Sequence, residues 1–149
     1  SDFVGHTRVA QDNVFSLEHR YRIDDAHFTL RRNEINLTFG PGDKWGAVAR
    51  YFFLDRDLGE GQNDIFINRE DREELQLSAF YQIDDNWRIS GLTVQNLTSG
   101  RDTIEYGGEI SYIDECIEIG LQVRENFTVD RDFNPGTQVI FRLKLTNLG

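Results

Sequence analysis

The chain has 149 residues, and 16 Lys and Arg against 26 Asp and Glu give it a net charge of −10 at pH 7. This length suits one domain or a piece of a larger one, and 38% hydrophobic residues with only 2 Pro exclude a disordered chain. A mean hydropathy of −0.53 excludes a transmembrane helix, and a pI near 4.7 argues against nucleic-acid binding, which needs clustered Lys and Arg.

Residue usage also limits the chemistry of the chain. One cysteine excludes an internal disulfide and a multi-cysteine zinc site, and the three His have no metal-ligand spacing. No nucleophile elbow or other catalytic signature is present. The chain opens without a signal peptide and contains no Met, so we expect a mature or excised segment. The sequence predicts neither an enzyme, nor a metal site, nor a cofactor.

Apolar and polar residues alternate with a period of two along most of the chain, which is typical of β-strands. Phe15, Leu17 and His19, for example, alternate with Ser16 and Glu18. The pattern is weak in the first segment and less regular in the sixth. In chain order, the segments are 3–9, 15–23, 34–39, 45–53, 74–83, 87–97, 103–112, 117–124 and 138–145.

Residues that favour tight turns separate these segments. They lie at 12–13, 24–25, 40–43, 84–86, 99–100 and 114–115, and two longer connections run over 55–71 and 128–136. The sequence therefore predicts an all-β fold, an antiparallel up-and-down meander of about eight or nine strands within one domain, residues 1–149. Such a meander would form part or all of an outer-membrane-type β-barrel.

An alternating meander has two physical solutions. In a soluble barrel the apolar face points inward and lines a core or a cavity. In an outer-membrane barrel the apolar face points outward to lipid and the polar face lines the lumen. The alternation alone does not choose, because inverting the barrel preserves it.

Three features favour the membrane solution. Several segments reach the roughly 9–11 residues that a tilted strand needs to cross a bilayer. Short turns alternate with longer connections, as on the two rims of an outer-membrane barrel. Aromatic residues that suit an interfacial girdle flank the short turns, namely Phe39, Trp45, Tyr81, Trp87 and Tyr112.

The two faces receive different predicted roles. The lipid-facing residues would include Leu77, Ile119, Leu121, Phe141 and Leu143. The polar face mixes both signs of charge, which suits ion pairs across the strands of a wet lumen; its predicted members include Glu74, Glu109, Arg124 and Arg142. In the alternative, a soluble small β-barrel carrier, the same apolar residues line a cavity for an apolar ligand and the polar face is solvated.

Two acidic loops invite a calcium interpretation. In the segment 55–59, Asp55 and Asp57 would start such a loop, but Glu60 stands where an EF-hand loop needs Gly and Phe66 where it needs Glu. The segment 130–132 has the same limited support. We therefore predict no specific calcium site.

The closing part of the chain has a distinctive order of features. An Asp114-Glu115-Cys116 hairpin precedes a strand that ends in an aromatic residue, then an acidic loop and the ending Phe141–Gly149. Together with the Asp84–Arg88 turn and the Leu30–Glu34 strand, this order resembles the C-terminal end of the LptD, or organic solvent tolerance, family of lipopolysaccharide-assembly proteins, in its alphaproteobacterial form.

The resemblance implies a large barrel in the bacterial outer membrane whose lumen holds an LptE-like lipoprotein plug. Lipopolysaccharide would arrive from an N-terminal periplasmic domain and leave toward the outer leaflet through a lateral opening between the first and last strands. That domain and the early strands would lie outside residues 1–149. Here the last strand would be 137–148, and its seam residues Val139, Phe141, Leu143 and Leu145. Outer-membrane lipid and lipopolysaccharide are the implied partners.

The resemblance also gives Cys116 a role. The family places in this hairpin a cysteine that pairs with the N-terminal domain, and some members have two adjacent cysteines where this chain has Cys116 and Ile117. A disulfide fits an oxidising periplasm, and its partner would lie outside this sequence. The alternative is a buried, inert thiol.

Overall fold

A computed structural model describes residues 2–55, 71–98, 102–127 and 136–145 of the chain. No helix in these ranges has the length and apolarity to cross a membrane. The described residues form nine strands: β1 (Phe3–Gln11), β2 (Phe15–Ile23), β3 (Leu30–Phe39), β4 (Trp45–Leu54), β5 (Arg72–Gln82), β6 (Trp87–Asn96), β7 (Thr103–Ile113), β8 (Ile117–Asn126) and β9 (Gly136–Leu145).

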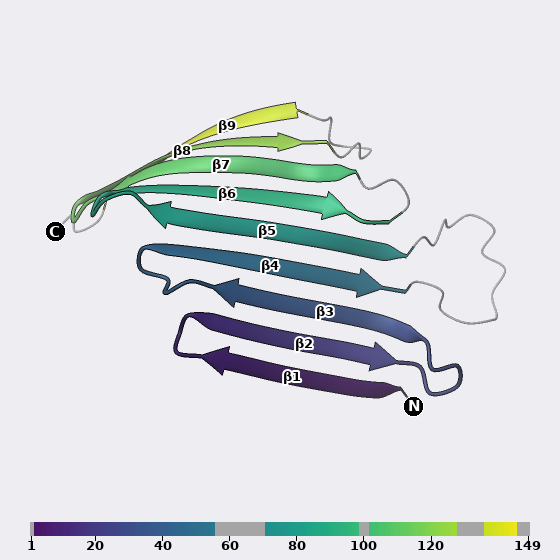
Figure 1. The fold of residues 1–149 in the computed structure, drawn as a ribbon. Coiled ribbons are helices and arrows are strands. Elements are labelled where there is room, and N and C mark those ends of the chain that lie inside the picture. Colours follow the sequence, from purple (N-terminus) through teal and green to yellow (C-terminus); the bar gives the residue numbers. More distant parts are fainter. Residues whose placement is uncertain (1, 56–70, 99–101, 128–135, 146–149) are drawn as a thin grey trace.

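Each strand pairs antiparallel with the next, so the nine strands make one meander sheet in chain order (Figure 1). This confirms the all-β meander expected from the alternation. The weak first segment and the irregular sixth are both strands. In β6, Leu92 and Val94 lie on the polar face, and a register irregularity follows Val94, which explains the blurred pattern there.

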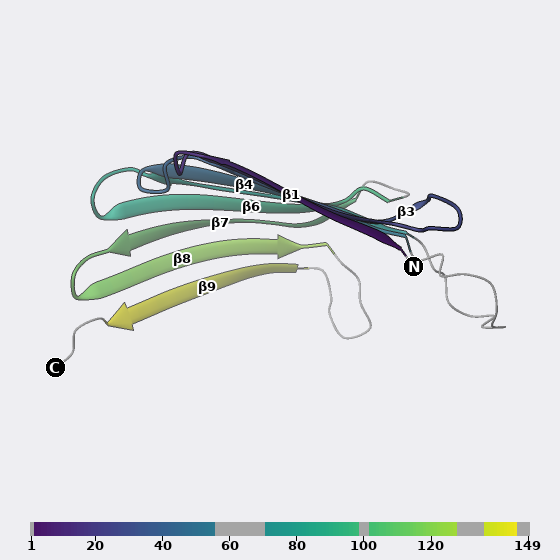
Figure 2. The same cartoon turned by 90° about the horizontal axis from the view of Figure 1, so that it is seen from below.

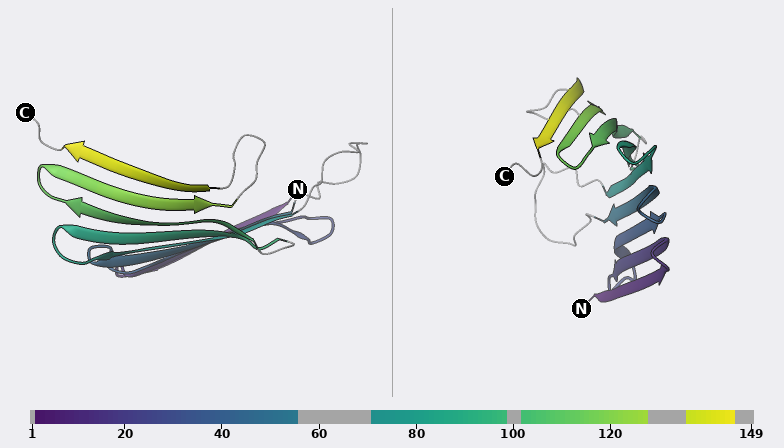
Figure 3. Two further views of the ribbon diagram at one scale, coloured as in Figure 1. Left: turned by 90° about the horizontal axis from the view of Figure 1, so that it is seen from above. Right: turned by 90° about the vertical axis from the view of Figure 1, so that its left-hand side faces the viewer.

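The sheet is a single curved layer. Figures 2 and 3 show the strands following one another along an arc that bends round through β6 to β9. The sheet is open: within the described residues, β1 and β9 each have one neighbouring strand and one free edge. A trough, rather than a closed ring, is therefore the observed shape.

The turns at 12–13, 24–25, 40–43, 84–86 and 114–115 form where the sequence predicts them, whereas the predicted turn at 99–100 and most of the two long connections, 55–71 and 128–136, lie outside the described residues. Asp12 and Asn13 have φ of 45° and 57°, which suits the short polar side chains that tolerate left-handed backbone. In the turn between β3 and β4, Gly40 has φ of 104°, and a Cβ built there would lie 2.5 Å from the carbonyl oxygen of Trp45. Only glycine fits both demands at this position.

The described residues have no hydrophobic core. None of their apolar side chains is buried, and the chain's accessible surface is 11436 Å². A soluble monomer of 17.3 kDa would expose about 7,800 Å². One face of the sheet therefore leaves its apolar side chains without a protein partner.

The strand register is staggered in one direction across the sheet. Phe15 is the first residue of β2. Its successive register partners across the sheet are Ala47, Gly91 and Val123 on the later even-numbered strands. They lie two, four and six residues after the first residues of β4, β6 and β8. At about 3.4 Å per residue and about 4.8 Å between strands, two residues per hairpin correspond to a tilt of about 35°. This is the lower end of the range for strands in closed barrels, about 35–45°.

Candidate functional site

The predicted lipid-facing residues share one face of the sheet. Leu121 pairs in register with Phe141, and Ile119 pairs with Leu143, so four of the five form a patch on β8 and β9. Leu77 lies on the same face of β5. Phe141 is 65% exposed, the highest value among these five. We call this surface, which carries the odd-numbered residues of β5 and β8, the apolar face.

The side chains of the opposite, polar face are less exposed to solvent than those of the apolar face. Along the middle of β5 to β8 its side chains are half-buried or buried, whereas most of their apolar-face neighbours are exposed. On β7, for example, Ser111 of the polar face is 7% exposed and Ile110 of the apolar face 41%. In a curved layer the sheltered side chains lie on the concave side. The apolar face is therefore convex.

An ion pair that spans three strands supports this direction of curvature. Arg142 of β9 donates a hydrogen bond to Glu109 of β7, above Gly120 of the intervening β8. A Cβ at Gly120 would lie 3.1 Å from Oε1 of Glu109. Bending of the sheet toward this face shortens the reach between side chains two strands apart, and the absence of a side chain at Gly120 leaves room for them to meet.

Further ion pairs follow the polar face. Nε of Arg124 lies 3.1 Å from Oε1 of Glu105, although the two atoms are not aligned for a hydrogen bond. Nε of Arg72 donates to Glu74 at 2.7 Å. The four predicted lumen residues thus lie on this face and each has a charged partner. Only Glu109 and Arg142 contact each other.

The predicted aromatic girdle forms pairs at the short turns. Trp87 and Tyr112 are register partners with ring centroids 5.2 Å apart. Trp45 and Tyr81 are register partners as well. Phe39 pairs with Phe15, whose ring centroid lies 5.1 Å away and which the sequence prediction left out.

At the other end of the apolar face lies a row of polar pairs that the sequence prediction missed. Tyr51 donates to Glu73 at 2.7 Å, and Tyr106 donates to Glu125. A ring nitrogen of His19 lies 2.8 Å from Oδ1 of Asn33. The available signal was the position of Glu73 and of Glu125. Each carboxylate falls at a position that the period-two alternation of its own strand assigns to apolar residues. The apolar side chains between these pairs and the aromatic girdle form an apolar band, and the polar pairs mark its edge opposite the girdle.

Cys116 lies in the turn between β7 and β8 and is exposed. The alternative of a buried, inert thiol is therefore wrong, because the turn projects beyond the paired strands and leaves the side chain in solvent. No other cysteine exists in the sequence to pair with it.

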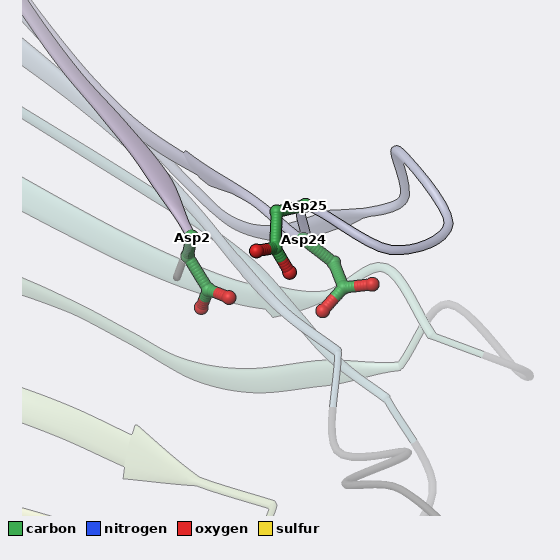
Figure 4. A group of neighbouring side chains, drawn as sticks. All are labelled: Asp2, Asp24 and Asp25. Atoms are coloured by element: carbon green, nitrogen blue, oxygen red, sulfur yellow. The ribbon is translucent and has the colours of Figure 1, made fainter.

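Three carboxylates gather near the start of the sheet (Figure 4). Ligand atoms of Asp2, Asp24 and Asp25 lie within 4.8 Å of one another. Asp2 accepts a hydrogen bond from Arg22, and the backbone N–H of His27 donates to Asp24 at 3.0 Å, which holds the pKa of Asp24 below its usual 3.8. Protein donors thus already stabilise the carboxylates of Asp2 and Asp24.

The two segments considered as calcium-binding loops, 55–59 and 130–132, lie largely outside the described residues. Of 55–59 only Asp55 is described, and its Oδ2 lies 3.3 Å from Nη1 of Arg31. The segment 130–132 is not described.

Comparison with models of known protein families and with curated proteins finds no match for this chain. The structure itself defines a class of surface: a curved antiparallel sheet that is polar on its concave side and apolar on its convex side.

Proposed function

We propose that the chain is part of a β-barrel in the bacterial outer membrane, with the apolar face toward lipid and the polar face toward the lumen. The observation that carries this proposal is the exposure of the apolar face on the convex side, together with shelter of the polar face on the concave side. A soluble barrel requires the reverse, since its apolar side chains line the interior. The soluble carrier is therefore the weaker candidate.

The dimensions of the apolar band support a membrane position. On β5, Tyr81 of the girdle lies eight residues after Glu73 of the polar row. At about 3.4 Å per residue and a tilt of about 35°, these residues are about 22 Å apart along the barrel axis. The apolar band of outer-membrane barrels is about 25 Å tall.

Strand parity supports a part of a barrel rather than a whole one. In a nine-stranded meander β1 and β9 run in the same direction, so their direct pairing would be parallel. Bacterial outer-membrane barrels are usually antiparallel throughout, with an even number of strands. An odd number of further strands between β9 and β1 would close this sheet in that way.

The more specific proposal is that this barrel assembles lipopolysaccharide into the outer leaflet. It rests on the resemblance of the closing segment to the LptD family. In this proposal β9, with Val139, Phe141, Leu143 and Leu145 on its convex face, forms one side of a lateral gate. An LptE-like plug would lie against the polar face, and outer-membrane lipid against the apolar face.

Depletion of the protein in the cells that produce it tests this activity. We expect newly made lipopolysaccharide to stop reaching the cell surface, measured by pulse labelling and surface capture. An unrelated outer-membrane barrel should continue to assemble over the same period, which controls for general damage. Undiminished surface delivery after depletion would contradict the assembly proposal.

A further inference from the structure

Three polar side chains form a row across the middle of the polar face. Asn36 of β3 pairs in register with Arg50 of β4, which pairs with Gln76 of β5. They lie side by side on adjacent strands and point to the same side as Phe52. We call these three residues the central row.

The central row has no side-chain hydrogen bond or ion pair within the described part of the chain, unlike most charged groups around it. Oδ1 of Asn36 is buried and has no partner. Buried polar atoms are nearly always hydrogen-bonded, and because Oδ1 is an acceptor, its missing partner would be an N–H or O–H donor. Three arginines on β2, β3 and β5 have carboxylate partners: Arg20 bonds Glu18, Arg32 bonds Glu34 and Arg72 bonds Glu74.

The central row borders a hollow of about 290 Å³ on the polar face, which Glu18, Glu34 and Glu74 also line. Each of these glutamates is offset by its own arginine partner. Arg50 therefore leaves one positive charge without compensation beside the hollow. An uncompensated guanidinium next to amide groups suits an oxyanion, to which Arg offers two parallel N–H donors.

We propose that the central row binds an oxyanion of the phosphate-monoester class. Arg50 supplies the charge and paired donors, the side-chain N–H groups of Gln76 donate to the flanking oxygens, and Oδ1 of Asn36 accepts a hydrogen bond from a hydroxyl of the ligand. This inference rests on the proposed function, because it places the hollow on the lumenal wall, where a phosphate-bearing ligand would pass.

Calorimetric titration tests the site. The full 149-residue chain, refolded in zwitterionic detergent at low salt, is titrated with inorganic phosphate, glucose 1-phosphate and methyl glucoside. We expect both phosphates to bind once per chain and methyl glucoside to bind at least ten-fold more weakly. Arg50→Gln should weaken phosphate binding at least ten-fold, and Arg50→Lys should weaken it less because the charge remains.

Arg8→Gln is the matched control. Arg8 lies on the same face of β1, has no ion pair within the described residues, and is outside the hollow. Its loss should change phosphate affinity less than two-fold. Unchanged binding by Arg50→Gln with native circular dichroism, equal losses in both variants, or no phosphate binding by the parent chain would overturn the proposal.

The detergent belt of the same preparation separates this inference from the proposed function. Phosphate binding by a chain without a belt would contradict the membrane placement and support the site. A belt without phosphate binding would contradict the site alone.

Discussion

Arg142 reaches across a whole strand to bond Glu109, and the side chain that would block it is missing because residue 120 is glycine. The contact ties β9, at the free edge of the sheet, to β7 on the sheltered face. Both side chains keep some contact with solvent, with exposed fractions of 18% for Glu109 and 51% for Arg142. The pair is therefore a modest stabilising contact that reports the curvature of the sheet.

Gly120→Val should separate this ion pair. The added side chain would begin 3.1 Å from Oε1 of Glu109 and 3.5 Å from Nε of Arg142, so the two partners would have to move to accommodate it. We expect faster hydrogen exchange of the β9 amides and a loss of about 1 kcal/mol in unfolding free energy, measured by urea titration in micelles. Gly91→Ala is the control, since a Cβ there meets its nearest atom at 3.8 Å. Equal β9 exchange in the two variants would contradict the bridging role of this pair.

Leu121→Arg tests which face meets lipid. An arginine at the midplane of a bilayer costs an outer-membrane barrel about 2–4 kcal/mol. We expect a loss of this size in reversible folding into liposomes. Gln122→Arg places the same side chain one residue further on, on the polar face, where the cost should stay below about 1 kcal/mol. A larger loss from Gln122→Arg than from Leu121→Arg would reverse the assignment of the faces.

Tyr51→Phe tests the polar row at the far end of the apolar band. Removing the hydroxyl leaves Glu73 without its donor at 2.7 Å. We expect a loss of about 1–3 kcal/mol in unfolding free energy in lipid, because the carboxylate lies beside the apolar band. Tyr81→Phe removes a hydroxyl with no bonded partner among the described residues, so its effect should be near zero. Equal effects of the two variants would show that the Glu73 contact adds no stability.

The two tryptophans test the position of the girdle without any substitution. Trp45 and Trp87 are the 2 Trp of the sequence, and both begin strands on the same rim. In liposomes we expect stronger quenching by lipids brominated near the headgroup than by lipids brominated at the chain ends. Quenching by aqueous iodide with no response to either lipid would place the girdle in water.

The period-two alternation was enough to predict the strands and the membership of each face. Leu77 and Leu121 are assigned to one face from their own segments, because successive side chains in a strand point to opposite sides. The turns at Asn13 and Gly40 could likewise be predicted from the turn-forming residues themselves. These features depend on residues within a few positions of each other.

The direction of curvature could not be predicted in this way, since the alternation is the same for either direction. It emerges from contacts such as Glu109 with Arg142, which are 33 residues apart. The central row needs the register of three strands at once before Asn36, Arg50 and Gln76 become neighbours. Local pattern carries no information on that register, so this candidate site was missed.

Detergent bound per folded monomer, measured by sedimentation in a density-matched detergent, tests the central claim most directly. We predict a β-rich monomer that carries a belt of detergent, because the convex apolar face has no protein partner within the described residues. A compact, β-rich monomer free of detergent would place those side chains inside and contradict the membrane assignment.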